Sequence, residues 1–368
     1  MTLDLFQLRK LLHQTPELAF QEHRTKELLL SYLKKLTGIK IHEFSTNTGI
    51  LVEYSQGQGA YRLFRADMDA LPVSEQTGCA FSSLNQGMMH ACGHDIHMTV
   101  LMGLIARICA EQPRVNLLFL FQPAEEGWGG AEAVLAEGLI QTFNVKEVYA
   151  LHVAGGMELG KISSREGVFF AIPQEFDVTF RGKAAHVAFS GQGINALQAG
   201  LRFMNMMQES VARLSQREKV IFHVGRMEAG RIRNVVADIC KLEGTHRSLR
   251  KEVSGQLNDL IQLNSRLASD EYGATAKVDL LCSYDPVVNA PALVAALKEV
   301  VHQAGAVWQE AETAMTGEDF GFFTTRYPGL LFWLGSGCKH PLHSELFLAD
   351  EACIPLGVEI FTRLALRN

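Results

Sequence analysis

The chain has 368 residues, of which 47% are hydrophobic and 20% charged, with 34 basic and 40 acidic side chains giving a net charge of −6. This composition is typical of a globular protein and excludes a mainly disordered chain, and the length predicts about two domains. The mild negative charge offers no basic surface, so we expect no nucleic-acid partner and no membrane partner.

The cysteines and the hydrophobic runs indicate the compartment. Seven cysteines are scattered without any C-x-x-C pair, which favours reduced thiols over a disulfide scaffold. The first residues lack the apolar core of a secretory signal, and no apolar run reaches the ~18 residues of a spanning helix. We therefore expect a cytoplasmic protein.

Hydrophobic periodicity predicts alternating helices and strands at both ends of the chain. Leucines at three- and four-residue steps predict two helices before residue 34, on either side of Pro16. Continuous apolar runs predict buried strands, and a long apolar stretch predicts a helix between them. The expected strands are Gly49–Tyr54, Tyr61–Arg65, Val115–Phe121, Glu147–Val153 and Leu330–Leu334, and the expected helices are His94–Ala110, Ala290–Ala304 and Ile354–Leu366.

The middle of the chain has a different order. The pattern predicts strand, helix, strand, strand, helix and strand, which is the ferredoxin-like order. These elements are expected at Glu175–Phe180, Ile194–Leu214, Val220–Met227, Val235–Gly244, Leu249–Leu267 and Ala274–Ser283. We therefore predict an α/β fold with two domains: a catalytic metal-binding domain of residues 1–172 and 285–368, and an inserted α+β lid of residues 173–284.

The segment HACGHDIH, residues 90–97, concentrates groups that bind metals or relay protons. Cys92 and His94 directly precede the expected apolar helix, and thiolate and imidazole are ligands of Zn²⁺ and other borderline divalent metals. A lone cysteine here would more simply be a small buried hydrophobe. The clustering with histidines favours a metal site.

Three further stretches place possible ligands after predicted strands. Glu125 and Glu126 follow the most apolar strand, where carboxylates are costly unless a cation meets them. His152 ends another buried strand, and His343 lies in a loop after a third. Each alone is also explained by a solvated loop or a satisfied core histidine. Ligands bind at the carboxyl ends of such strands, so together they predict one site.

Five ligands exceed what one tetrahedral zinc needs, so the set predicts two divalent metals. Such a site lowers the pKa of bound water towards ~7 and makes it a nucleophile. Glu125, the carboxylate left over, is then the natural general base, and the predicted reaction is hydrolysis of an amide or peptide bond. The proposed ligands are Cys92, His94, Glu126, His152 and His343.

Ordered motifs over nearly the whole chain resemble the M20 family of metallo-amidohydrolases and peptidases, in its amidohydrolase branch. The stretches that carry the resemblance are LRKLLHQTPELAFQE, RADMDALPVSE, MHACGHDIHM, FQPAEEGWGGAE, GKAAHVA, AMTGEDFGFF and PLHSE. The resemblance implies a di-metal α/β domain with an inserted ferredoxin-like lid that often dimerises, and hence a homodimer through the lid.

The resemblance also implies roles for single residues. The five ligands and Glu125 match the family's metal shell and base, and Asp69 of RADMDAL is expected to orient a ligand or the base. His186 of GKAAHVA resembles a lid histidine that acts as an oxyanion donor, and Asn234 is an expected substrate contact. Carboxylates of the substrate call for a cationic contact as well, for which Arg231, Arg233 and Arg247 are candidates and Arg247 is chosen. The metals are Zn²⁺, Mn²⁺, Co²⁺ or Ni²⁺, because thiolate and imidazole ligands do not suit Mg²⁺ or Ca²⁺.

Within the branch, FQPAEEGWGGA, SREGVFFA and FWLG resemble the subgroup that removes acetate from N-acetyl-L,L-diaminopimelate on the acetylase route to lysine. Ala184 and Ala185 stand where many members have Gly-Gly. This difference lies in the lid, so it affects the fit of the substrate more than the metal chemistry. A broader aminoacylase, a carboxypeptidase or an amidohydrolase of aryl-acyl amino acids therefore stays open, as does a non-catalytic binding protein. The expected substrate is a small N-acyl amino acid.

Overall fold

The computed structural model describes residues 4–367, which form two compact units. Unit 1 contains the described residues up to Phe169, then Val287–Thr313 and those from Asp319 onward. Unit 2 contains Phe170–Pro286 and Ala314–Glu318. The last segment differs from the predicted boundary because the backbone N–H of Ala171 donates to the carbonyl of Ala314 at 2.9 Å.

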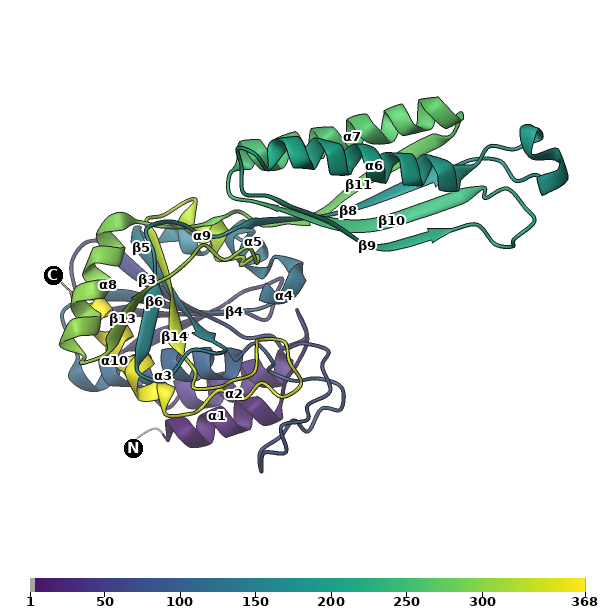
Figure 1. Cartoon of the computed structure of the whole chain (residues 1–368). Helices are drawn as coiled ribbons and strands as arrows, with labels where there is room; N and C mark the ends of the chain where they lie inside the picture. The colour runs from purple at the N-terminus through teal and green to yellow at the C-terminus, as the bar shows by residue number, and fades with distance from the viewer. Residues whose placement is uncertain (1–3, 368) are drawn as a thin grey trace. The chain divides into compact units, whose positions relative to one another are not determined.

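Unit 1 is built on a mixed ten-stranded sheet, which confirms the α/β prediction (Figure 1). Its centre consists of parallel strands in the order β4-β3-β5-β14, and β1 and β2 extend it with antiparallel pairs. The strands are β1 (Ile39–Glu43), β2 (Ile50–Ser55), β3 (Tyr61–Asp67), β4 (Asn116–Gln122), β5 (Val145–Ala154), β6 (Lys161–Ser164), β7 (Gly167–Phe170), β12 (Val287–Asn289), β13 (Val307–Glu310) and β14 (Gly329–Gly335).

Helices cover both faces of this sheet. The helices of unit 1 are α1 (Leu5–Gln14), α2 (His23–Leu33), α3 (His94–Glu111), α4 (Glu125–Trp128), α5 (Gly130–Ala136), α8 (Pro291–Gln303), α9 (Gly321–Thr324) and α10 (Cys353–Leu366), with the short 3₁₀ turn η1 (Ile140–Thr142). The apolar helix α3 packs on β3 and β5, with α1 and α10 beside it. Across residues 4–367, no helix combines the length and apolar character that a membrane crossing requires.

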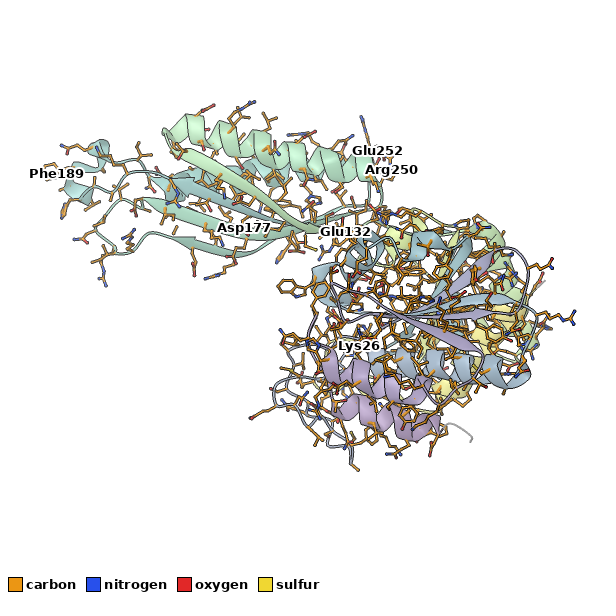
Figure 2. All side chains as sticks on the ribbon, turned by 180° about the vertical axis from the view of Figure 1, so that it is seen from behind. Lys26, Glu132, Asp177, Phe189, Arg250 and Glu252 are labelled. Atoms are coloured by element: carbon orange, nitrogen blue, oxygen red, sulfur yellow. The ribbon has the colours of Figure 1, made fainter. Side chains whose placement is uncertain are left out.

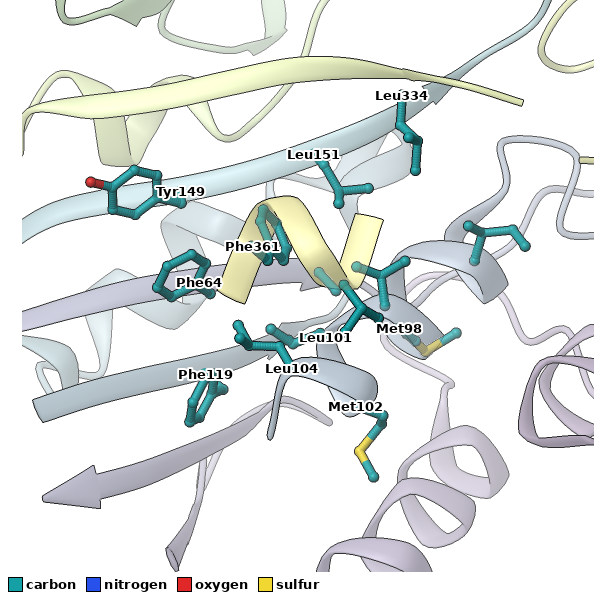
Figure 3. Close-up of a cluster of buried hydrophobic side chains, with 14 of the residues drawn as sticks. Phe64, Met98, Leu101, Met102, Leu104, Phe119, Tyr149, Leu151, Leu334 and Phe361 are labelled. Carbon is teal, nitrogen blue, oxygen red and sulfur yellow. The ribbon is translucent and has the colours of Figure 1, made fainter. Parts of the chain in front are cut away.

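The core of unit 1 lies between α3, α10 and the central strands (Figure 3). Phe64 of β3 stacks on Tyr149 of β5, with ring centroids 4.9 Å apart, and meets the edge of Phe361 of α10 at 5.1 Å. Leu101 and Leu104 of α3 are fully buried in the same cluster. This packing fixes the start of α3 against the carboxyl ends of the strands.

Unit 2 has the ferredoxin-like order β8-α6-β9-β10-α7-β11, with the antiparallel sheet β11-β8-β10-β9 under two helices (Figure 1). The elements are β8 (Ile172–Arg181), η2 (Val187–Gln192), α6 (Ala196–Leu214), β9 (Ile221–Ala229), β10 (Ile239–Ser248), α7 (Lys251–Tyr272) and β11 (Thr275–Ser283). The strand expected at Val235–Gly244 begins four residues later, because the N–H of Val236 donates to Ala185 across a loop.

Candidate metal centre

The five predicted ligands lie together in unit 1, around the carboxyl ends of parallel strands. Cys92 and His94 flank the start of α3, Glu126 follows β4, His152 is near the end of β5, and His343 lies in the loop after β14. In open α/β sheets this edge is where ligands bind. The chain therefore gathers thiol, imidazole and carboxylate groups from four separate segments.

Glu126 lies between two groups of possible ligands. On one side, its Oε1 is 3.4 Å from His343 Nε2, and Cys92 Sγ is 3.4 Å from the same nitrogen. On the other side, Glu126 Oε1 is 3.9 Å from His94 Nε2. Cys92 Sγ is also 3.4 Å from His152 Nε2. A carboxylate placed between two sets of donors is suited to bridging two cations.

Backbone carbonyls set the tautomers of two of the histidines. His94 Nδ1 donates to the carbonyl of Asp69 at 2.9 Å, and His152 Nδ1 donates to the carbonyl of Val153 at 2.7 Å. Each ring therefore keeps a proton on Nδ1 and directs Nε2 towards the centre. Burial disfavours a charged His94 ring, but Asp67, Asp69 and Glu126 outweigh it and raise its pKa to about 10, so a cation would displace the Nε2 proton there. This arrangement orients histidines as metal ligands.

The donor atoms fit divalent cations. His94 Nε2 and Glu126 Oε1 are buried and accept or donate no hydrogen bond, which is unfavourable unless a cation meets them. Burial, and then the charges of Glu126 and Glu125, raise the pKa of the Cys92 thiol well above its ordinary value. A coordinated metal ion reverses this effect, because it holds the sulfur as thiolate.

Glu125, the predicted base, is held by the backbone beside this centre. The two carboxylate oxygens of Asp69 accept the N–H groups of Glu125 and Glu126, at 3.0 and 2.9 Å. Glu125 Oε1 accepts the N–H of Asp319 at 3.4 Å, and a carboxylate oxygen of Glu125 lies within 4.8 Å of donor atoms of His94 and Glu126. Asp69 thus orients both members of the acidic pair and, through its own carbonyl, the ring of His94.

A buried chain of polar groups that the sequence reasoning left without roles supports the ligands. Asp67 Oδ1 accepts from His97 Nδ1 at 2.6 Å, and its other oxygen accepts from Arg65 at 2.8 Å. His97 Nε2 accepts the N–H of Val153 at 2.9 Å, so this ring is neutral, and burial lowers its pKa accordingly. The i, i+3 spacing of His94 and His97 on a predicted helix was the available signal.

Unusual backbone conformations occur where the ligands are presented. Gly93, between Cys92 and His94, caps α3 with φ of +82°, and a Cβ there would lie 2.3 Å from Val153 Cγ2. Ala124 and His343 also have positive φ, at +57° and +66°. Such conformations are costly for residues other than glycine and cluster at functional sites.

The predicted lid residues all lie in unit 2 but not in one place. The backbones of His186 and Asn234 are neighbours, because His186 pairs with Val235, and both side chains are exposed. Arg247 lies near the opposite end of β10, where it donates to Glu175 at 3.2 Å. Arg247 is eight positions after Ile239, the first residue of β10, which corresponds to about 26 Å of extended strand. Within a single copy of unit 2, Arg247 is therefore far from both His186 and Asn234.

The chain is similar to known proteins over nearly its full length. Residues 63–367 match the family profile of peptidase family M20/M25/M40. N-acetyldiaminopimelate deacetylases from Lactococcus lactis and Oceanobacillus iheyensis are 38% and 36% identical, each over 97% of this chain and 96% and 97% of their own lengths. The crystal structure of a dinuclear metal-binding peptidase of family M20 from Bacillus subtilis superimposes with a TM-score of 0.86 and 28% identity, over 98% of this chain and 96% of that one.

Proposed function

The chain belongs to peptidase family M20/M25/M40, and on that basis we propose that it is a metal-dependent amide hydrolase that removes acetate from N-acetyl-L,L-diaminopimelate. The reaction consumes one water and gives acetate and L,L-diaminopimelate. It belongs to the acetylase route of lysine biosynthesis, and the enzyme is cytoplasmic.

The observation that carries the proposal is the division of labour within the pair Glu125–Glu126. Glu126 Oε1 is a buried oxygen without a hydrogen bond, placed between the histidine ligands. Glu125 is equally fixed at its backbone by Asp69; its Oε1 accepts the N–H of Asp319, and one of its oxygens lies within 4.8 Å of donor atoms of His94 and Glu126. A metal-binding protein without catalysis has no use for a second carboxylate held in this way.

Two divalent metal ions, held by Cys92, His94, Glu126, His152 and His343, would activate water and polarise the amide carbonyl. Glu125 takes a proton from the attacking water and delivers it to the nitrogen of the leaving amine as the C–N bond breaks. Asp69 is a positioning residue, because it acts by holding Glu125, Glu126 and His94 in place.

The substrate assignment rests on the relatives, which are named as deacetylases of this one compound. The test is hydrolysis by metal-reconstituted protein of N-acetyl-L,L-diaminopimelate, beside N-acetyl-methionine, hippurate and an indole-acyl amino acid, with the freed amino acid measured in each case. We expect the highest kcat/KM for the diaminopimelate compound and loss of all turnover with chelator. A higher kcat/KM for another acyl group would assign a broader aminoacylase, a carboxypeptidase or an aryl-acyl amidohydrolase.

We propose two further roles for unit 2 in this function: homodimer formation, and substrate contact through His186 and Asn234 of one copy with Arg247 of another, because these residues lie far apart within one chain. The strand β9 is an edge of its sheet, which leaves one row of backbone groups open to pairing. Figure 2 shows Phe189, 62% exposed, projecting from the η2 segment next to His186. Sedimentation equilibrium tests the dimer, and a monomer at micromolar concentration would exclude it.

A further inference from the structure

A second group of metal-binding side chains lies in unit 1, outside the proposed catalytic centre. It consists of His13 on α1 and of Glu75 and Cys79 in the loop after β3. One donor atom from each lies within 4.8 Å of the others. The proposed hydrolysis uses none of these residues.

The distances between donors match the edges of a tetrahedral site. His13 Nε2 is 3.3 Å from Glu75 Oε1, and Cys79 Sγ is 3.7 Å from the same oxygen. Bond lengths of about 2.0–2.1 Å to N and O and about 2.3 Å to S imply edges of roughly 3.3 and 3.5 Å. The His13–Glu75 distance is long for an N–H···O hydrogen bond, whose usual length is about 2.9–3.0 Å.

A carboxylate on the far side of the ring orients His13. Asp95 Oδ2 accepts from His13 Nδ1 at 2.8 Å and forms an ion pair with Arg9, whose Nε is 3.0 Å away, and all three side chains are almost fully buried. Nδ1 is therefore tied to Asp95, and Nε2 faces Glu75, to which it donates its proton unless a cation takes the place of that proton. Carboxylate, histidine and metal commonly stand in this order in protein sites.

The loop presents its two ligands in a fixed arrangement. Glu75 Oε2 accepts the N–H of Ser83 at 2.6 Å, and Thr77 donates its hydroxyl to Oε1. Gly78, with φ of +67°, turns the chain between Glu75 and Cys79. Cys79 is half-buried, so its thiol side of the site is partly accessible from solvent.

Protons compete with a cation for these atoms. Burial disfavours the imidazolium, but Asp95 and the groups near Nε2 outweigh it and raise the pKa of His13 to about 10. Burial of Cys79 is outweighed by hydrogen bonds, first from His13, which lower the pKa of its thiol to about 7. A cation at this site therefore has to displace the Nε2 proton of His13 and hold Cys79 as thiolate.

We propose that His13, Glu75 and Cys79 form a third metal site, for Zn²⁺ or a similar borderline divalent cation, separate from the catalytic centre. The ligand types are those of such metals, and the site joins α1 to the loop of residues 75–83. Its ion is bound next to α3 through Asp95, one residue after the ligand His94.

Cobalt absorption separates this site from the catalytic one. A Cys92→Ser variant loses the catalytic thiolate, so any remaining thiolate-to-Co²⁺ charge-transfer band comes from another cysteine. We expect the band to remain in Cys92→Ser, to disappear when Cys79→Ser is added, and to remain when Cys282→Ser is added. Cys282 is the matched control, because it is the other half-buried cysteine of residues 4–367.

Absence of the band in Cys92→Ser, or its persistence in the Cys79 double variant, would overturn the proposal. Zinc uptake by equilibrium dialysis gives a second measurement in case Cys92→Ser does not fold. Wild-type protein should hold one equivalent of Zn²⁺ more than Cys79→Ser, with deacetylase turnover retained in both. Equal uptake by the two proteins would also overturn it, whatever their activity.

Discussion

Glu125 and Glu126 are neighbours in the chain, yet the structure gives their carboxylates different surroundings. Replacing Glu125 with Gln keeps the shape and removes the proton acceptor. We expect kcat to fall by about 10²–10⁴-fold, while metal content and melting temperature stay unchanged. Glu132→Gln is the control, because Glu132 is exposed on the nearby helix α5. Full turnover in Glu125→Gln would exclude this residue as the base.

Site residues that occur in sequence motifs could be predicted, whereas residues that act by positioning other side chains could not. The clustering of Cys92, His94 and the acidic pair was visible in the chain, and the structure places these groups together. The spacing of His94 and His97 places His97 near the centre, but it does not predict the roles of Asp67 and His97, since these depend on the position of the Val153 backbone in another strand. Contacts of that kind follow from packing and not from local pattern.

At the scale of elements, the start of α3 depends on one glycine. Gly93→Ala costs about 1–2 kcal/mol for the left-handed conformation, and its Cβ would additionally meet Val153 Cγ2 at 2.3 Å. We expect a lower melting temperature together with reduced metal binding, because Cys92 and His94 move. Gly138→Ala is the control: its φ is +76°, but no atom lies within 4 Å of the added carbon.

The control separates strain from collision at that turn. Gly138→Ala should lose only the stability that the left-handed conformation costs, and it should keep its full metal content. Equal stability and equal metal binding in the two variants would show that Val153 yields to the extra carbon, and that Gly93 is not needed to place the ligands.

Long apolar elements were predictable, and short or mixed ones were not. The expected His94–Ala110 helix and Val115–Phe121 strand match α3 and β4 within about one residue, because burial on several sides leaves a continuous apolar run. The short strands β6, β7 and β13 gave no such pattern. The β10 boundary moved because backbone pairing with residue 185 replaced a strand at Val235.

At the scale of the whole molecule, the two units have separate cores. Unit 2 buries Phe176, Phe180 and Phe203 in a cluster of its own, and nearly all of it is one continuous segment. We therefore expect a fragment of residues 170–286 to fold alone with a cooperative thermal transition. In that fragment, Phe203→Ala should cost about 3–5 kcal/mol, and the surface change Glu252→Gln almost nothing. An unstructured fragment by circular dichroism would contradict this prediction.

The stability of unit 1 should depend on pH through Glu22, which is fully buried. Its carboxylate accepts the N–H groups of Phe20 and Ala124 at 2.9 and 3.0 Å and the hydroxyl of Thr48, and so joins three loops. Burial is the main cause that raises its pKa from 4.5 to about 7; the Thr48 hydrogen bond opposes it, and the charge of Asp69 adds to it.

Between pH 4.5 and 7, the folded protein keeps the Glu22 proton while the unfolded chain releases it. The free energy of unfolding therefore falls as pH rises through this window, by on the order of 3 kcal/mol for this group. Glu75, whose pKa is lowered to about 2, titrates below the window. The Glu22→Gln side chain cannot titrate, so this variant should not lose that stability. The free energy of unfolding of Glu22→Gln, minus that of wild type, should therefore increase from pH 5 to pH 7.

Urea unfolding of the metal-free protein, followed by tryptophan fluorescence, measures this difference. All three tryptophans of the chain, Trp128, Trp308 and Trp333, belong to unit 1, so the signal reports the unit that contains Glu22. Chelator keeps metal binding, which also varies with pH, out of the comparison. A constant difference between the two proteins at pH 5 and pH 7 would mean that Glu22 is ionised throughout, held so by its three donors against the cost of burial.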